Sequence, residues 1–268
     1  MFGWWKRNRR RKLKKKPFNP EWRELIDANF DIFGCLTREQ QNELINHVKV
    51  FLAEKNFEGC GGLELTDEMK VIIAAQACLL LMHRHTDYYS RLKSILVYPS
   101  SYFGVSNDPE DADDGEHRLG ESWDTGVIVL AWDAVLNGAH NVADGHNLVF
   151  HEFSHQLDQE DGRADGLPIL NEKGDSFLDR RGKYSAWAQV FSREFKQHVE
   201  HTRRGKRTVL DEYGATNPAE YFSVATECFF EKPNSMKKKH PQLYRELKKF
   251  YKLDPASWRT RRYRVNRE

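Results

Sequence analysis

Apolar residues recur with helical spacing through the first third of the chain. Thr37 and Gln40 form a T-x-x-Q capping box, which predicts an amphipathic helix that ends near Ala53. A glycine-rich stretch at residues 59–62 interrupts this pattern. A threonine–aspartate pair then opens a run rich in alanine and leucine, which predicts a buried helix over residues 69–82.

The middle of the chain has the pattern of β-strands. Residues 94–98 (SILVY) end at a proline and predict one strand, and residues 126–132 (GVIVLAW) predict a second. The second strand is a candidate sheet edge for pairing with an extended peptide, although a buried strand has the same pattern. Helical spacing returns over residues 147–158, 184–201, 218–230 and 240–251. These elements predict an α+β fold that is mostly helical and has a small mixed sheet.

The composition is that of a folded protein. Apolar residues make up 39% and charged residues 31% of the 268 positions, and no apolar run approaches the 18 residues of a membrane-spanning helix. The four cysteines are scattered without a C-x-x-C pair, which excludes a disulfide scaffold and a cysteine-based zinc site. A reducing, cytoplasmic location is therefore expected.

The net charge of +2 conceals an uneven distribution along the chain. Residues 6–16 (KRNRRRKLKKK) hold nine lysines and arginines and no acid, which leaves 33 basic residues against 40 acidic ones elsewhere. Residues 108–116 form a second charged segment, with six acids among nine positions. Their spacing does not match an EF-hand, so a solvated acidic loop is expected rather than a calcium site.

Three interpretations compete for the basic arm, residues 1–19. It can be a solvated, disordered tail, a contact with an anionic membrane surface through residues 1–16, or a contact with nucleic acid. Phe2, Trp4 and Trp5 favour the membrane surface, where indole rings lie well beside lysines. No nucleic-acid partner is expected.

The remainder of the chain has no internal repeat and no linker rich in glycine, serine or proline. One unit over residues 20–256 is therefore expected, with a helical layer over about 20–90 and the candidate chemistry over 147–230. The basic tail, residues 257–268, is expected to fray.

The candidate chemistry begins with the H-E-x-x-H motif that runs from His151 to His155. Residues four apart lie on one face of a helix, so both imidazoles can bind a single zinc ion. Phe150 and Phe153 fall on the opposite face, which predicts a helix with its back in the core and its histidines at a cleft. The alternative is an exposed amphipathic helix whose two histidines bind nothing.

A third ligand is sought near the start of the helix predicted over 218–230. Asn217 suits the N-cap and Pro218 the first helical position, so Glu220 lies in the first turn. Glu220 can be a ligand, or it can reach back to the backbone N–H of the cap residue. Glu227, seven residues on and therefore on the same face, is the rival ligand. Spacing alone does not choose between the two.

These residues resemble the Mlc titration factor A family of bacterial zinc peptidases. The matching segments are H-E-x-x-H, Tyr213 with N-P-A-E at 217–220, G-L-E-L-T-D-E at 62–68, V-Y-P at 97–99 and G-E-S-W at 120–123. The resemblance extends over roughly residues 20–255. It implies a zincin-like fold related to the catalytic domain of anthrax lethal factor.

The resemblance also implies roles for five residues. His151, His155 and Glu220 bind Zn²⁺ as in gluzincins, Glu152 is the general base, and Tyr213 steadies the oxyanion. Family members cleave small substrates as aminopeptidases and bind the glucose-regulatory repressor Mlc, so a peptide substrate and an Mlc-like repressor are the expected partners. The basic arm and the acidic loop have no counterpart in the family pattern.

Physical chemistry supports these roles but leaves alternatives open. A glutamate beside a zinc ligand can take a proton from the attacking water and pass it to the leaving amine. Tyr213 can donate to the oxyanion or can simply pack at the rim of the site. Asp158 or Glu227 can orient a ligand histidine through its second ring nitrogen. A non-catalytic protein that sequesters a transcriptional regulator is the rival to an enzyme.

Overall fold

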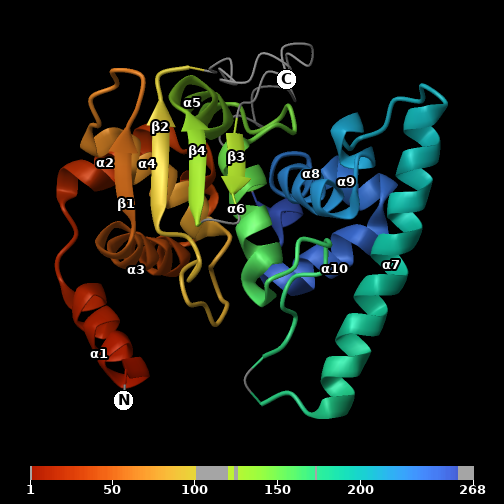
Figure 1. Ribbon diagram of the computed structural model, residues 1–268, viewed down its shortest axis with the longest axis horizontal. Helices are drawn as coiled ribbons and strands as arrows, with labels where there is room; N and C mark the ends of the chain where they lie inside the picture. The colour runs from red at the N-terminus through yellow and green to blue at the C-terminus, as the bar shows by residue number, and fades with distance from the viewer. Residues whose placement is uncertain (1, 101–119, 124–125, 173, 259–268) are drawn as a thin grey trace, which may run out of the picture.

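The computed structural model describes residues 2–100, 120–123, 126–172 and 174–258. It is an α+β fold, mostly helical with a small mixed sheet, so the predicted fold class is confirmed. Figure 1 shows the sheet together with helices α1 to α5 in one half of the molecule and helices α7 to α10 in the other half, with α6 between the two halves. The predicted acidic loop at 108–116 and the tail beyond residue 258 lie outside the described residues.

The sheet has the strand order β1-β2-β4-β3. β1, β2 and β4 are parallel, whereas β3 is antiparallel to β4. The two predicted strands are β2 and β4. Of the two alternatives for β4, the sheet edge is wrong and the buried strand is right, because β4 is an interior strand. That edge is formed by β3, which contacts α6. The strand bounds are Asn56–Gly59 for β1, Ser94–Tyr98 for β2, Gly120–Trp123 for β3 and Val127–Ala131 for β4.

Six helices lie where the sequence predicted them. They are α3 (Arg38–Glu54), α4 (Asp67–Leu79), α6 (Leu148–Asp158), α7 (Phe177–Arg203), α8 (Pro218–Glu231) and α10 (Pro241–Tyr251). Helix α7 begins earlier than predicted because Ser176 and Asp179 form a capping box at its start. Among the described residues, no helix combines the length and the apolar composition needed to cross a bilayer.

The remaining helical segments were not predicted. The α-helices are α1 (Phe2–Lys15), α2 (Pro20–Asn29), α5 (Trp132–His140) and α9 (Pro233–Lys239). The 3₁₀ segments are η1 (Asp31–Cys35), η2 (Gln159–Asp161), η3 (Glu212–Ala215) and η4 (Pro255–Ser257). Most of them are short, and short segments give a weak periodic signal.

The core holds α6 firmly from behind. Phe150 and Phe153 are fully buried, as the predicted apolar back of this helix requires. The Phe153 ring lies 4.9 Å from the ring of Tyr89 and 5.7 Å from that of Phe51, which joins α6 to α3 and to the segment after α4. On the other side, Phe150 lies 5.0 Å from Phe230 of α8. The position of α6 is therefore fixed by aromatic packing that is worth several kcal/mol in total, at roughly 0.5–1.5 kcal/mol per pair beyond area burial.

The basic arm differs from the disordered tail that the sequence suggested. Residues 2–15 form helix α1, which packs against α3. The Arg10 guanidinium lies 2.9 and 2.7 Å from the two carboxylate oxygens of Glu54 and 2.7 Å from Asp87, and in this network Arg10 and Glu54 are largely buried whereas Asp87 is half-exposed. The sequence alone gives no sign of this network, because the acidic partners of Arg10 lie 44 and 77 residues away along the chain. A run of basic residues without known partners is therefore interpreted as solvated. Contact with an anionic membrane stays a prediction. Trp4 and Trp5, both exposed, are available for it.

Candidate metal centre

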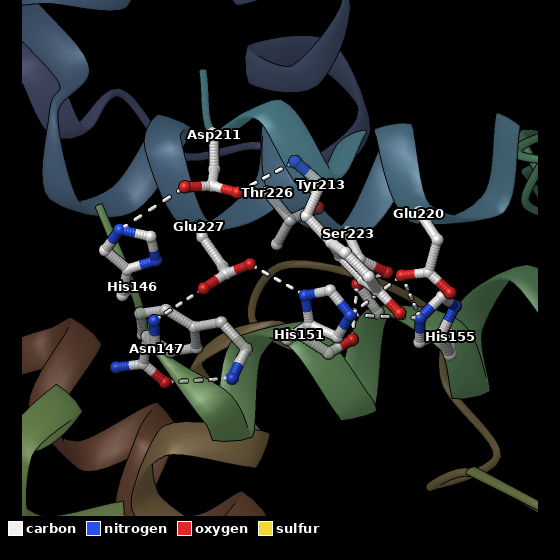
Figure 2. Close-up of polar contacts among 12 residues, drawn as sticks. His146, Asn147, His151, His155, Asp211, Tyr213, Glu220, Ser223, Thr226 and Glu227 are labelled. Carbon is white, nitrogen blue, oxygen red and sulfur yellow. Dashed lines mark hydrogen bonds and ion pairs between the residues drawn. The ribbon is translucent and has the colours of Figure 1, made fainter. Parts of the chain in front are cut away.

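Helices α6 and α8 lie side by side (Figure 2), and each begins at an asparagine cap. The Asn147 side chain accepts a hydrogen bond from the Phe150 backbone N–H at 2.9 Å, which starts α6. The Asn217 side chain accepts from the Glu220 backbone N–H at 3.0 Å, and Pro218 occupies the first position of α8. The two caps set where each helix begins and therefore which side chains face each other.

Three side chains converge between the two helices. Glu220 Oε2 lies 3.0 Å from His151 Nε2 and 3.2 Å from His155 Nε2, and the two Nε2 atoms lie 3.3 Å apart. Within the part of the chain that the structure describes, this is the one group of His, Cys, Asp or Glu side chains arranged to hold a metal ion. The three side chains are 11–17% exposed, so the cluster is mostly enclosed but keeps some access to solvent.

The other nitrogen of His151 contacts Glu227. His151 Nδ1 lies 2.7 Å from Glu227 Oε1, and the second oxygen of Glu227 accepts a hydrogen bond from the Asn147 N–H at 2.6 Å. The structure therefore separates the two glutamates that spacing could not distinguish. Glu220 meets both Nε2 atoms, and Glu227 meets the Nδ1 atom of one ring. In Figure 2, these two carboxylates approach His151 from opposite sides.

The carboxylates and imidazoles of the cluster shift each other's protonation. Burial alone would lower the pKa of His151, but the charge of Glu227 and the hydrogen bonds to Glu220 and Glu227 outweigh it and raise that pKa well above 6.5. Burial alone would raise the pKa of Glu220, but hydrogen bonds from His151 and His155 lower it to about 2. The carboxylates therefore attract the protonated imidazoles strongly. A metal cation that binds here has to displace a proton from the histidines.

Glu152 and Tyr213 border the cluster in different ways. Glu152 is 4% exposed, its Oε2 atom has no hydrogen-bond partner within the described residues, and burial raises its pKa. Tyr213, on η3, is half-exposed, and its ring lies 5.9 Å from the ring of His151. Figure 2 shows Tyr213 extending from η3 toward the histidines. The structure thus brings all five predicted site residues to one place.

Of the two residues considered for orienting a ligand histidine, Glu227 is the one whose carboxylate contacts a ring nitrogen of His151. Asp158 instead accepts a hydrogen bond from the Gly166 N–H at 2.8 Å, which ties the end of α6 to the following loop. Burial raises the pKa of Asp158 to about 6.

Two supporting contacts were missed in the sequence. Asn147 donates from its side chain to Gly138 O at 2.9 Å and to Gln76 Oε1 at 3.0 Å, so one buried residue joins α4, α5 and α6. Ser154 Oγ lies 2.8 Å from Ser223 Oγ and links α6 to α8. An asparagine before an apolar helical run is a cap signal that could have identified Asn147. The serine pair gives no sequence signal.

Comparison with known proteins decides the family. The model of the family described as "Glucose-regulated metallo-peptidase M90" matches residues 2–252. The chain belongs to this M90 family. The M90 name implies a metal ion, and the cluster of His151, His155 and Glu220 is where the described residues can hold one.

Curated relatives agree with this assignment. "Uncharacterized protein slr2042" of Synechocystis is 38% identical over 252 residues, with 92% of this chain and 89% of that protein aligned. Proteins named "Mlc titration factor A" from Escherichia coli and Shigella flexneri are 28% identical over 243 residues, with 87% of this chain and 86% of each relative aligned. The resemblance inferred from the motifs is confirmed.

Proposed function

We propose that this M90 protein is a zinc-dependent peptidase whose zinc ligands are His151, His155 and Glu220. The observation that carries the proposal is the triangle of donor atoms, with sides of 3.0, 3.2 and 3.3 Å. Tetrahedral zinc with bonds of about 2.0–2.1 Å places its ligand atoms about 3.3 Å apart. Two imidazoles and one carboxylate are also a known catalytic donor set, which leaves a fourth position for water.

The contact between Glu227 and His151 Nδ1, on the far side of the ring from Glu220, supports this ligand assignment. A hydrogen bond from His151 Nδ1–H to Glu227 leaves the Nε2 lone pair directed at the site and fixes the orientation of the ring. Glu227 is itself held by the Asn147 N–H at the start of α6. The imidazole is therefore positioned before any metal binds.

The proposed chemistry assigns one task to each bordering residue. Zinc, when bound, would polarise the scissile carbonyl and lower the pKa of its water from about 15.7 toward 7. Glu152 accepts a proton from the attacking water and delivers it to the leaving amine, and its unpaired Oε2 is available for that exchange. Tyr213 donates its hydroxyl to the developing oxyanion, a contribution of roughly 2.7–4 kcal/mol for one such donor.

Aminopeptidase specificity is part of the proposal and is supported by the family resemblance. We expect the protein to release the first residue of short peptides with a free amino end and to leave amino-acetylated copies of the same peptides intact. Mass spectrometry of a peptide panel incubated with the zinc-loaded protein measures both. Cleavage of free and acetylated peptides at the same internal bonds would show an endopeptidase instead.

A second candidate function is binding of a transcriptional repressor. The name "Mlc titration factor A" of the curated relatives supports an Mlc-like repressor as a partner of this chain. A purely non-catalytic binding protein is disfavoured by Glu152, because binding alone needs no buried glutamate beside the histidines whose Oε2 atom has no hydrogen-bond partner among the described residues. The four cysteines are free thiols, which supports our placement of the protein in the cytoplasm.

A further inference from the structure

A second cavity lies beyond the C-terminal end of α6. It has a volume of about 650 Å³ and is bounded by the segment after α4, η2, the loop before α7, α7 itself and the end of α10. None of the three side chains of the metal cluster lines it. Its size falls in the range of small-molecule sites, roughly 300–1,000 Å³.

One part of the cavity wall is apolar. Trp187 and Phe250 are almost fully buried, and their rings lie 5.4 Å apart. The Trp187 Nε1–H donates to Gly166 O at 3.0 Å, so the polar atom of the indole is already satisfied. Leu170 adds an aliphatic surface from the loop before α7. An apolar part of a ligand would be stabilised against this surface, because its contact with the surface removes apolar area from water.

Arg84 is the exceptional residue of this wall. Its guanidinium lies 3.8 Å from the centre of the Phe250 ring. Its Nη1 atom is buried and has no hydrogen-bond partner within the described residues, and this side chain forms no ion pair with any of them. Burial lowers the pKa of Arg84, and the negative charge of Glu160 opposes this shift in part. Glu160, which lines the same cavity, interacts with Arg84 by charge but forms no ion pair with it, so the buried Nη1 atom keeps a hydrogen-bonding capacity that an anionic ligand can satisfy.

The other cations of the cavity are already paired. Lys183 lies 2.9 Å from Asp175, Lys249 lies 2.7 Å from Glu246, and Lys252 lies 3.0 Å from Glu172. Among the lysines and arginines that line the described cavity, Arg84 alone has no such partner.

The charge balance also limits the ligand. Glu172 and Glu246 are paired with Lys252 and Lys249, but Glu160 also lines the cavity and interacts with Arg84 by charge, and its negative charge disfavours a dianion such as a phosphate monoester. A carboxylate carries one charge and matches the planar guanidinium with two parallel hydrogen bonds.

We propose that this cavity binds a molecule with an apolar body and a single carboxylate, and that Arg84 holds the carboxylate. The C-terminus of a short peptide and a free aromatic or aliphatic acid share this chemistry. The proposal does not depend on the peptidase function, because it uses none of the residues of the metal centre.

Two pairs of probes test the proposal by calorimetric titration of the zinc-loaded full chain. The first pair is N-acetyl-leucyl-phenylalanine and its C-terminal amide, and the second is 4-phenylbutyrate and 4-phenylbutyramide. We expect a carboxylate of at least one pair to bind about tenfold tighter than its amide, because a hydrogen bond to a charged group is the stronger kind. Binding confined to the first pair identifies a peptide C-terminus, and binding confined to the second identifies a free acid.

Variants of Arg84 locate the binding. Arg84→Gln is expected to weaken carboxylate binding by about ten- to a hundredfold, and Arg84→Lys by less, because lysine keeps the charge. Arg245→Gln is the matched control, since Arg245 is exposed on α10 and does not line the cavity. A carboxylate that bound at the metal centre would be unaffected by Arg84→Gln, and that result overturns the proposal. Equal binding of acids and amides, or no binding of either acid, overturns it without any variant.

Discussion

Replacing Glu152 with glutamine is expected to lower the rate of peptide cleavage by about two to four orders of magnitude, the usual contribution of general-base catalysis. Glutamine has nearly the size of glutamate and fits the buried position on α6, but its amide cannot accept a proton from water. The Oε2 atom of Glu152 makes no hydrogen bond within the described residues, so no polar contact of this atom is lost. The kcat of wild type and variant at equal zinc content measures the effect.

Glu212→Gln is the matched control for this variant. It makes the same chemical change next to Tyr213, where the side chain is exposed, and is expected to leave kcat unchanged. Glu152→Gln should also retain its zinc, because Glu152 is not one of the proposed ligands. Unchanged turnover in Glu152→Gln would refute the mechanism and would favour the non-catalytic binding protein.

Replacing Glu220 with alanine is expected to remove most of the affinity for zinc. This change takes away the donor that lies 3.0 and 3.2 Å from the two imidazoles and leaves a site with only two protein ligands. Glu227→Ala is expected to cost about 10- to 100-fold in zinc affinity, which is typical of a residue that only orients a ligand. Titration of zinc against a competing chelator measures both values.

Glu227 is a close control for Glu220, because both are glutamates of α8 that contact His151. The two alanine variants therefore lose the same side chain from the same helix, and they differ in which imidazole nitrogen loses its contact. If Glu227→Ala removes the metal and Glu220→Ala retains it with near-normal affinity, the ligand assignment is reversed. Glu220 would then act only as a capping residue in the first turn of α8, not as a metal ligand.

Local signals explain why much of the fold could be predicted. The T-x-x-Q box placed the start of α3 correctly, because the hydrogen bonds of a capping box join residues only three apart. Asn217 and Pro218 did the same for α8. The H-E-x-x-H motif put two imidazoles on one helix face by helical geometry alone. By contrast, β1 (NFEG) and β3 (GESW) are too short and too polar for a strand pattern.

Contacts between distant residues explain what could not be predicted. Glu220 and Glu227 lie on the same face of one helix, and their different contacts appear only when α6 is placed against α8, 69 to 80 residues away in sequence. The same limit applies to Arg10, whose partner Glu54 is 44 residues away. It also applies to β4, which resembled an edge strand until β3 was seen to pair with it.

The central claim is that one zinc ion, held by His151, His155 and Glu220, is required for peptide cleavage by this M90 protein. The most direct measurement is titration of zinc into the metal-free protein while cleavage of one peptide is followed. We expect no cleavage without metal, a rise in proportion to the zinc bound, and saturation at one zinc per chain. Full cleavage by the metal-free protein, or no cleavage with one zinc bound, would contradict the claim.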